Sequence, residues 1–498
     1  MKRYNLLLVL LLVFPQFLFA QDLSDAFRLS HVRPQGTARS AGMGNAFGSL
    51  GGDFTSISIN PAGSAVYQTG EFMITPGYFY NESELTLNGT KSSDNDQTFR
   101  LYNIGAVGVF KTNDEASGIV SVNYAIGYNR LANYNSKAFA NFSNSEVSWL
   151  DDLADYATNE GLKNAYLNQN IGYIEYRDWT SKLAYETYLV NPATDNNGNV
   201  IDGKYTPNLN TGEKVNQYKT YSQSGHMDEY LFNLSVNFNH SFYVGATIGF
   251  VDIDYKRYSL YQEDLLDDNS SFSSIDEYKM DGHGVNFKIG TIFKPTPFVR
   301  LGLALHSPTF YDIDDQSFLD MESKLTSTYY AKGLNEYEYD FNSPWKAIAS
   351  GAVILHKSAL ISADLEYMNY ANMRFRRGGT NGNDGFSDLN SSIEDNFKNV
   401  FNLRLGAEVK LTNQFAVRAG YERYANPFEG KLEQLSTLTD AVSVYSCGFG
   451  YMINSFSLNV AYSQTLTDIA QGNPQSTYDQ LQQEDTAQKV LVTLGFRF

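Results

Sequence analysis

The sequence is short of several residue types that whole classes of protein require. A single cysteine, Cys447, stands among 498 residues, so the chain can form no internal disulfide. Lys and Arg number 37 against 55 Asp and Glu, and the resulting net charge of -18 argues against a nucleic-acid partner. There are six His, and the His–Ser neighbour at 306–307 has no carboxylate or amide placed to complete a triad. We therefore expect no catalytic site.

Long apolar runs are also missing beyond the N-terminus. Apart from residues 1–20, no run approaches the roughly 18 apolar residues that a membrane-spanning helix needs. The first twenty residues read MKRYNLLLVLLLVFPQFLFA, with basic Lys2 and Arg3, an apolar run and a small residue, Ala20, at its end. This pattern predicts a secretory signal peptide over residues 1–20, cut before Gln21.

What the sequence has in abundance is aromatic residues in a two-residue period. Tyr, Phe and Trp make up 14% of the chain. From about residue 71 onward, apolar residues alternate with Asn, Ser, Gly, Lys and Arg, as at 230–238 and 242–250. The runs are about 9–14 residues long, which suits strands that cross a membrane at a tilt.

Short and long connections between these runs alternate. Short ones lie near 111–117, 239–241, 294–297, 356–358, 412–414 and 454–455, and long polar ones near 88–97, 136–226, 262–274, 311–340, 376–397, 424–440 and 466–485. This spacing predicts an all-β fold, a transmembrane antiparallel β-barrel of about 14 strands over residues 71–498, with its largest loop at 136–226. The last strand, ending at Phe498, must pair with the first one, near 71–88, because a bilayer tolerates no open edge.

Residues 21–70 do not follow the alternation. They are rich in Gly, Ser, Ala and Asn, and the spacing of Gly42, Gly44 and Gly48 superficially suggests a nucleotide-binding loop. The segment before Gly42 is basic and polar and contains Pro34, so it cannot be the buried strand that such a loop follows. Two alternatives remain: a disordered periplasmic tail, or a plug for a lumen too wide for its own side chains to fill.

The stretch GMGNAFGSLGGDFTSISINPAG, Gly42 to Gly63, resembles the N-terminal hatch of the FadL/TodX/OmpP1 family of outer-membrane transporters for hydrophobic compounds. Its most specific part is Asn60, Pro61 and Ala62 after the Gly-rich segment, and 127–134, 300–311 and 403–424 also agree. The resemblance implies a fourteen-stranded barrel in the bacterial outer membrane. It also implies that residues 21–70 form a plug, with Gly42, Gly44, Gly48, Asn60, Pro61 and Ala62 as its motif.

From the barrel and the resemblance we expect a passive channel for hydrophobic molecules, with long-chain fatty acids as the leading class. The alternative is a non-transport barrel of the same fold family that acts in secretion or binds exported proteins. We expect a monomer that contacts outer-membrane lipid and lipopolysaccharide and needs no cofactor. The acidic segments 262–281 and 312–322 are interpreted as solvated surface, with calcium binding left open, and His31, the one haem-ligand candidate, as a solvated side chain.

The long loop contains a short amphipathic helix in SEVSWLDDLADYA. Trp149, Leu150, Leu153 and Tyr156 lie on or beside its apolar stripe. Two interpretations remain open: the stripe packs against the barrel as an ordinary cap, or it forms an apolar groove that captures ligand first.

Charged residues that face the lumen fall into two groups. Face-matched pairing over 401–422 sets Arg404 opposite Glu422 and Glu408 opposite Arg418, which we interpret as structural pairs. Lys288 and Arg300 also face inward but have no carboxylate partner within their hairpin. They are therefore predicted to be free cations that meet a ligand carboxylate.

The third strand suggests a side opening. Val120 to Tyr128 keep the lipid-facing phase, with Gly127 on the lumen side, and the same phase would turn Arg130 toward lipid. Either the strand has reached the membrane interface by Arg130, or a kink near Gly127 shifts the phase and opens the wall.

Overall fold

The computed structural model describes residues 23–87, 90–112, 118–210, 212–266, 270–355, 358–377, 385–430, 437–471 and 481–498. The predicted signal peptide and its cleavage site lie outside these residues.

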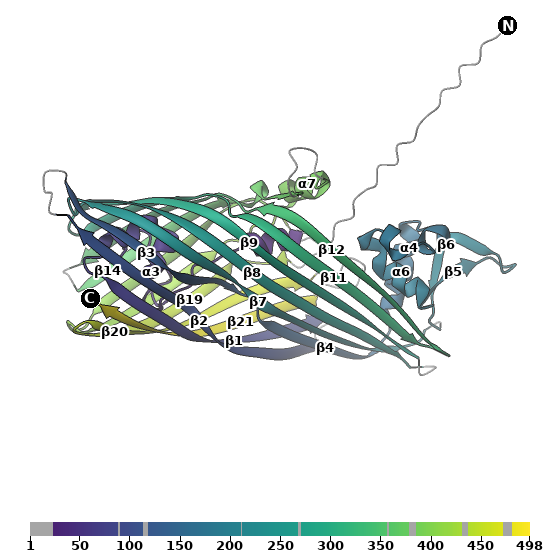
Figure 1. The fold of residues 1–498 in the computed structure, drawn as a ribbon. Coiled ribbons are helices and arrows are strands. Elements are labelled where there is room, and N and C mark those ends of the chain that lie inside the picture. The colour runs from purple at the N-terminus through teal and green to yellow at the C-terminus, as the bar shows by residue number, and fades with distance from the viewer. Residues whose placement is uncertain are drawn as a thin grey trace, which may run out of the picture.

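Fourteen antiparallel strands in the described part of the chain close into a barrel (Figure 1). The first, β1 (Glu71–Leu87), pairs on one side with β2 (Thr90–Lys111) and on the other with the last, β21 (Leu481–Arg497). Three of the wall strands between them are each made of two consecutive segments: β3 (Ile119–Asn133) with β4 (Ser136–Ser145), β10 (Val299–His306) with β11 (Phe310–Lys324), and β12 (Thr328–Asn342) with β13 (Lys346–Leu355). The other wall strands are β7 (Val215–Phe238), β8 (Phe242–Leu265), β9 (Ser271–Thr296), β14 (Ala359–Asn369), β16 (Asn399–Lys410), β17 (Phe415–Tyr424), β19 (Val442–Ile453) and β20 (Phe456–Gln471). The short β15 (Arg374–Arg376) and β18 (Thr437–Leu438) lie at the rim. The strand number and the pairing of the first strand with the last are confirmed.

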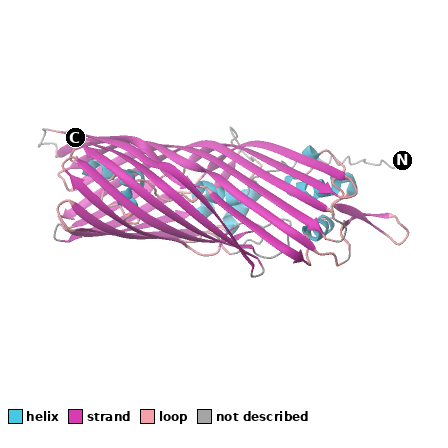
Figure 2. Cartoon of the chain, turned by 90° about the horizontal axis from the view of Figure 1, so that it is seen from below, coloured by secondary structure: helices cyan, strands magenta, loops and turns pink. Residues whose placement is uncertain are grey.

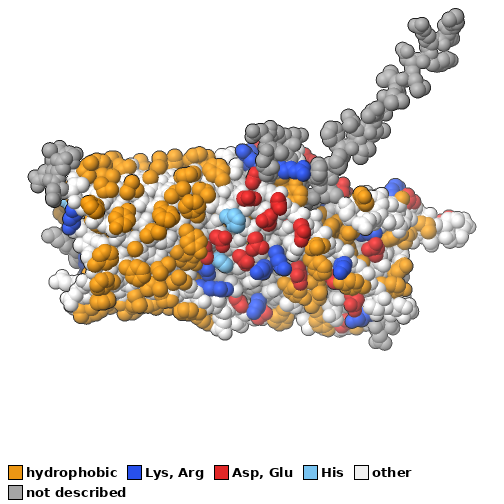
Figure 3. Space-filling view, in the orientation of Figure 1, with side chains coloured by type: hydrophobic (Ala, Val, Ile, Leu, Met, Phe, Trp, Pro, Cys, Tyr) orange, Lys and Arg blue, Asp and Glu red, His pale blue; other side chains and the backbone are white. Residues whose placement is uncertain are grey.

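The outer surface of the wall is divided into two zones along the strands (Figure 3). Near the end that carries the C-terminus, outward side chains are apolar and exposed, such as Leu234 at 58%, Ile289 at 58% and Leu303 at 65%. Farther along the same strands the outward positions are charged, and Asp252 and Asp312 are exposed there. The apolar zone is the part of the wall that meets the hydrocarbon of a bilayer.

Several long loops expected from the sequence are strands instead. The segment 311–340 forms most of the β11–β12 hairpin, and 262–274 extends β8 and begins β9. The expectation was wrong because it relied on an apolar outer face. Beyond the bilayer a strand faces water, so its outward residues become polar while the backbone ladder continues.

Residues 23–70, the hatch, lie inside the barrel (Figures 1 and 2). They form α1 (Leu23–Ser30), α2 (Ala38–Ala41), α3 (Phe54–Ile59) and the 3-10 helix η1 (Pro61–Val66). Asp53 caps α3, and Asn60 caps η1 by accepting a hydrogen bond from the Ala62 amide. Pro61 at the first position of η1 has no amide hydrogen to leave unsatisfied, which explains the Asn-Pro-Ala order.

A small unit covers the barrel end opposite the C-terminus (Figure 1). It comprises α4 (Trp149–Asn159), α5 (Asn164–Leu167), η3 (Ile171–Tyr173), η4 (Tyr176–Asp178), α6 (Trp179–Glu186) and the hairpin of β5 (Val190–Thr194) and β6 (Val200–Pro207). We call this unit, residues 146–210, the cap. Elsewhere η5 (Tyr370–Asn372) and α7 (Ser387–Asn396) follow β14. No helix in the described ranges is long and apolar enough to cross a membrane.

Candidate functional site

The hatch contacts the wall closely through glycines on several strands. We call these Gly105, Gly127, Gly245, Gly290, Gly302, Gly406 and Gly420 the glycine collar. A Cβ atom on Gly420 would lie 2.0 Å from the Gly44 nitrogen, and one on Gly290 would lie 2.0 Å from the Asn60 side-chain oxygen. Gly44 itself has a φ of 56°, a conformation that favours glycine. The motif glycines therefore serve close backbone packing inside the barrel.

Hydrogen bonds to wall carboxylates fix the hatch further. The Gly48 amide donates to Asp364 at 3.0 Å, the Asn45 side chain donates to Glu422 at 3.0 Å, and Arg39 donates to Glu408 at 3.2 Å. Because these contacts are directional and buried, moving the hatch would leave polar groups without partners.

The structure tests the charge pairs expected between β16 and β17. Arg404 lies opposite Glu422 and Glu408 opposite Arg418, as predicted. Arg418 and Glu408 form an ion pair at 2.6 Å. Arg404, however, binds Glu366 of β14 at 2.9 Å, which leaves Glu422 to hold the hatch.

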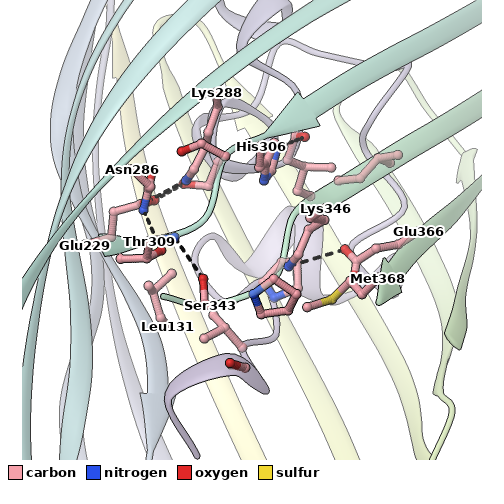
Figure 4. A pocket seen from close by; sticks show the side chains of 18 of the residues that line it. Leu131, Glu229, Asn286, Lys288, His306, Thr309, Ser343, Lys346, Glu366 and Met368 are labelled. Carbon is pink, nitrogen blue, oxygen red and sulfur yellow. Dashed lines mark hydrogen bonds and ion pairs between the residues drawn. The ribbon is translucent and has the colours of Figure 1, made fainter. Parts of the chain in front are cut away.

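A cavity of about 80 Å³ lies between the hatch and the wall (Figure 4). Its apolar lining includes Leu29 and Val32 of the hatch and Leu131 and Met368 of the wall. Its polar lining includes the amide of Asn286 and two ion pairs, Lys288–Glu229 between β9 and β7 and Lys346–Glu366 between β13 and β14. The cavity is therefore apolar on one part and charged but internally compensated on the other.

The expectation that Lys288 is a free cation is wrong. Its ammonium group forms an ion pair with Glu229, and both side chains are buried (Figure 4). The two residues lie on β9 and β7, with β8 between them. Arg300 donates to the Leu50 carbonyl of the hatch, while its Nε atom has no hydrogen-bond partner among the described residues. A ligand-binding role for either residue stays a prediction.

Reasoning within single hairpins also missed three residues of this site, Lys346, Glu366 and His306. Lys346 lies 3.6 Å from Glu366, which Arg404 binds from the other side. His306 contacts the Ile59 carbonyl of the hatch at 3.0 Å. Each occupies an inward position of an alternating strand, so charge at inward positions was the available signal.

Around α1 of the hatch, the lumen contains a packed cluster of apolar and aromatic side chains. The cluster includes Leu23, Ala26, Leu29, Met227, Val251, Ile253, Tyr255, Tyr278, Met280, Tyr311, Ile313, Tyr339, Phe341, Met368, Tyr370, Met373, Phe375, Phe386, Ile393, Phe397, Val400, Tyr424, Phe428, Leu438, Val442 and Val444. Three of these, Leu23, Ala26 and Leu29, belong to α1, so the apolar face of this helix is part of the lining. Leu29, Tyr311 and Met368 also line the cavity, so the apolar cluster borders it directly.

His31 lies where the hatch meets this cluster. Its ring packs 4.7 Å from that of Phe27, and Nδ1 is 3.4 Å from the Tyr370 hydroxyl. Burial, together with the charges of Arg33 and Lys346, lowers the pKa of His31 to about 3. His31 is thus packed against aromatic side chains and only partly exposed to solvent.

The residues proposed for a capture groove pack inside the cap. Leu150 and Leu153 are 0% exposed. Trp149 contacts the rings of Tyr261 and Phe272. The Tyr156 hydroxyl donates to Asp178 at 2.9 Å. In this structure the four residues belong to or pack against one apolar cluster that the cap shares with the barrel strands, and capture of ligand by them stays a prediction.

The wall is interrupted close to Gly127. The β2–β3 ladder ends at the pair Asn103 and Asn129, and in the described residues the rest of β2 pairs with β1 while β4 pairs with β7. We call this interruption the wall break. A Cβ atom on Gly127 would lie 2.4 Å from the Phe54 ring, so this glycine also makes room for the hatch.

Arg130 does not face lipid as the continued phase would require. A bulge follows it in the β3–β7 pairing, and the side chain is 6% exposed. Its Nε donates to Asp228 at 3.0 Å, and the Tyr128 hydroxyl donates to the same carboxylate at 2.9 Å. A lateral opening at this position stays a prediction.

Comparison with known proteins agrees with this architecture. A model of the outer membrane protein transport family (OMPP1/FadL/TodX) matches residues 231–498. The chain belongs to this family. The expected resemblance is thus confirmed, and the protein is a β-barrel of the bacterial outer membrane and a channel of the FadL/TodX type for hydrophobic compounds.

Solved structures of the family share the fold at low sequence identity. A Pseudomonas aeruginosa FadL homologue is 12% identical, with a TM-score of 0.54, over 94% of this chain and 99% of that one. The P. putida toluene transporter TodX is 12% identical, with a TM-score of 0.51, over 93% and 98%. The Ralstonia pickettii toluene transporter TbuX is 11% identical, with the same TM-score and coverage. No curated protein matches the sequence.

Proposed function

We propose that this FadL-type channel takes up long-chain hydrophobic molecules, with fatty acids as the leading class, and releases them sideways through the wall break. The observation that carries the proposal is the continuous apolar lining from the aromatic cluster into the cavity. Leu131 borders this cavity and lies on β3 beside the break. An elongated apolar ligand can therefore stay in contact with nonpolar side chains along this route.

Physical chemistry favours a sideways exit over release into the periplasm. Each CH₂ group that leaves an apolar environment for water costs about 0.8 kcal/mol. A long chain that moves from the lumen into the bilayer avoids this cost, and flow down a concentration gradient needs no energy-coupling device. The hatch, held by the glycine collar and wall carboxylates, supports the same route because it obstructs the direct path along the barrel axis.

The test is extraction and mass spectrometry of the lipids that co-purify with the full-length barrel, followed by uptake assays in cells. We expect co-purified fatty acids and faster uptake of oleate in cells that contain the protein. Uptake of toluene without uptake of oleate would contradict the proposed substrate class and favour monoaromatic compounds. A barrel that stimulates uptake of neither would contradict transport itself.

A further inference from the structure

Two neighbouring wall strands are interrupted at the same level, far along the wall from β3. Residues 307–309 separate β10 from β11, and residues 343–345 separate β12 from β13. On one side of the interruption His306 lies opposite Lys346, and on the other side β11 and β12 continue in the same register. The two gaps therefore face each other, and we call residues 307–309 and 343–345 together the proline window.

The register places Pro308 directly opposite Pro344 at the centre of the window. Along β10, even-numbered residues exchange backbone hydrogen bonds with β13, as where the Ile354 amide donates to the Phe298 carbonyl at 2.8 Å. Pro308 and Pro344 continue this series, but a proline nitrogen carries no hydrogen to donate. Both hydrogen bonds of this pair are therefore missing from the wall.

Both strands also exchange their inner and outer faces at the window. Even-numbered side chains such as Ala304 are buried in β10, whereas odd-numbered ones such as Ile313 are buried in β11. The same exchange separates Phe341 of β12 from Ile348 of β13. Since side chains and backbone bonds alternate together along a strand, no regular ladder can run through the exchange.

Few contacts hold the two gaps together. The Thr309 amide donates to the Ser343 hydroxyl at 2.8 Å (Figure 4), and the Ser343 amide donates to the Thr309 carbonyl at 3.1 Å. The next strand gives no support at this level, because β13 pairs with β14 only up to Lys346 and Met368. Beyond that pair, η5 turns Tyr370 into the lumen cluster. The window is thus a weakly bonded part of an otherwise continuous wall.

The cavity lies directly behind the window. Ser307, Thr309, Ser343 and Pro344 all belong to its lining, together with Leu29 and Val32 of the hatch on the inner side. On this side, one layer of chain without a regular ladder separates the cavity from the exterior. An opening between the two gaps would therefore lead straight into the cavity.

The outer surface around the window is typical of a membrane interface. Phe310 is 48% exposed and Trp345 is 54% exposed. Two residues beyond Phe310, Asp312 begins the charged zone. Of the three tryptophans in the sequence, two lie in the cap and the third is Trp345. Because tryptophan is enriched where hydrocarbon meets water, the window lies at the outer edge of the apolar zone.

The wall break near Gly127 has different surroundings. Phe99 lies on β2 beyond the end of the β2–β3 ladder, and Ile126 lies on β3 before it, and both are exposed apolar side chains. Apolar surface thus continues on both sides of the wall break, whereas charge begins beside the proline window. The two interruptions therefore meet different depths of the bilayer.

We propose that the proline window is the entrance of the channel, through which apolar molecules dissolved at the outer edge of the bilayer reach the cavity. The proposal rests on the proposed function and adds a lateral entrance to its lateral exit. A hydrophobic molecule partitions into the membrane before it meets the barrel, and return to water would cost about 0.8 kcal/mol for each CH₂ group. Entry through the window avoids that cost and requires no movement of the cap.

The first test closes the window with a disulfide. Thr309→Cys and Ser343→Cys are introduced together with Cys447→Ser, which removes the single cysteine of the chain. Opposite residues of antiparallel strands have Cα atoms about 4.5–5.5 Å apart, a distance that a disulfide can span. The matched control is Leu305→Cys with Ala347→Cys in the same background, an opposite pair in the unbroken ladder beside the window.

Oxidation of the window pair should reduce oleate uptake to the level of cells that lack the protein, and reduction should restore it. The control pair should take up oleate like the wild type in both states. Wild-type uptake by the oxidised window pair would overturn the window as entrance. If that pair does not give a folded barrel by heat-modifiable migration, Thr309→Cys alone, alkylated after folding with a bulky maleimide, replaces it with the same expected loss.

A second readout is independent of transport. An alkane that carries a diazirine, dissolved in liposomes that contain the protein, should label residues 23–36 of the hatch on illumination, because Leu29 and Val32 line the cavity. Oxidation of the window pair should abolish this labelling, and oxidation of the control pair should leave it unchanged. Labelling that persists in the oxidised window variant overturns the proposal. A wild type that is labelled in this way but stimulates no uptake overturns the proposed function and supports the window as an opening.

Discussion

The two parts of the lumen are filled by different kinds of contact. From α2 to η1, the hatch touches the wall through glycines and through hydrogen bonds to Asp364, Glu408 and Glu422. Around α1 the contacts are between apolar and aromatic side chains, with Leu23, Ala26 and Leu29 facing the lumen cluster. The first kind is directional and specific to one partner, whereas the second depends on little more than apolar area.

This difference separates a fixed part of the lumen from an exchangeable part. A hydrophobic ligand can replace apolar contacts made by α1 with equivalent contacts of its own. It cannot replace the amide donor of Gly48 or fit where Gly420 meets Gly44. The inner hatch should therefore stay in place while ligand occupies the outer lumen, and four perturbations test this contrast.

Removing most of the hatch should have the largest effect. Deleting residues 21–62 takes away the fixed contents of a barrel whose lumen is too wide for its own side chains to fill. We expect a folded barrel whose single-channel conductance in a planar bilayer rises by at least about tenfold. Unchanged conductance would show that these residues do not block the lumen.

Lys288→Met should destabilise the protein rather than act on ligand alone. The change leaves Glu229 buried without its partner, which costs about 3–5 kcal/mol. Urea unfolding of the purified barrel measures the loss. The double variant Lys288→Met, Glu229→Gln should recover much of it, and failure of this rescue would indicate that Lys288 acts through other contacts.

Gly420→Ala should loosen the hatch while leaving the barrel closed. The added methyl group would collide with the backbone of Gly44, and overpacking of this kind costs about 1–3 kcal/mol. Limited proteolysis should cut the hatch faster than in the wild type. Gly351→Ala is the matched control, because no atom lies within 4 Å of its Cβ position; equal protease sensitivity of the two variants would contradict a locked hatch.

Acid should weaken the packing of residues 23–36 of the hatch, because His31 becomes protonated. Its pKa is about 3 in the folded protein against 6.5 for the free side chain, so the docked state favours the neutral ring. The free energy by which neutral His31 stabilises the docked state is fully present above pH 6.5 and falls as the pH drops toward 3. The loss at pH 5 is no more than about 2 kcal/mol. Protection of residues 23–36 from protease should decline over this range, and His31→Gln should remove the dependence on pH; a wild type with constant protection would contradict it.

The membrane-facing part of the fold could be predicted because the bilayer imposes a strict pattern. Between 401 and 422, outward Phe401 and Leu405 are exposed and inward Arg404 is buried, as the alternation predicted. Residues 311–340 were misjudged because a strand in water needs no apolar outer face. Sequence patterns therefore located the bilayer zone more reliably than the full length of the strands.

The candidate site was harder to predict because its partners lie on non-adjacent strands. Hairpin reasoning found the Glu408–Arg418 pair but could not find Glu229 for Lys288, since another strand separates the two. Gly127 was singled out for a kink. Its close contact with Phe54 of the hatch could not be predicted from the sequence of β3 or of the hatch taken alone. Likewise, the helix α4 was predicted from its period, whereas its burial against Tyr261 and Phe272 depends on strands a hundred residues away.

Pairing between β1 and β21 sets the order in which the molecule can be made. These strands are separated by almost the whole wall, yet each is the other's neighbour. Until β21 is present, β1 and β20 expose unpaired backbone groups that hydrocarbon cannot satisfy. Assembly must therefore be completed as a single late event, with the hatch enclosed as the wall comes together. A ribosome that stalled before β21 would leave a chain that is suited to aggregation and to degradation, and no partly working channel would result.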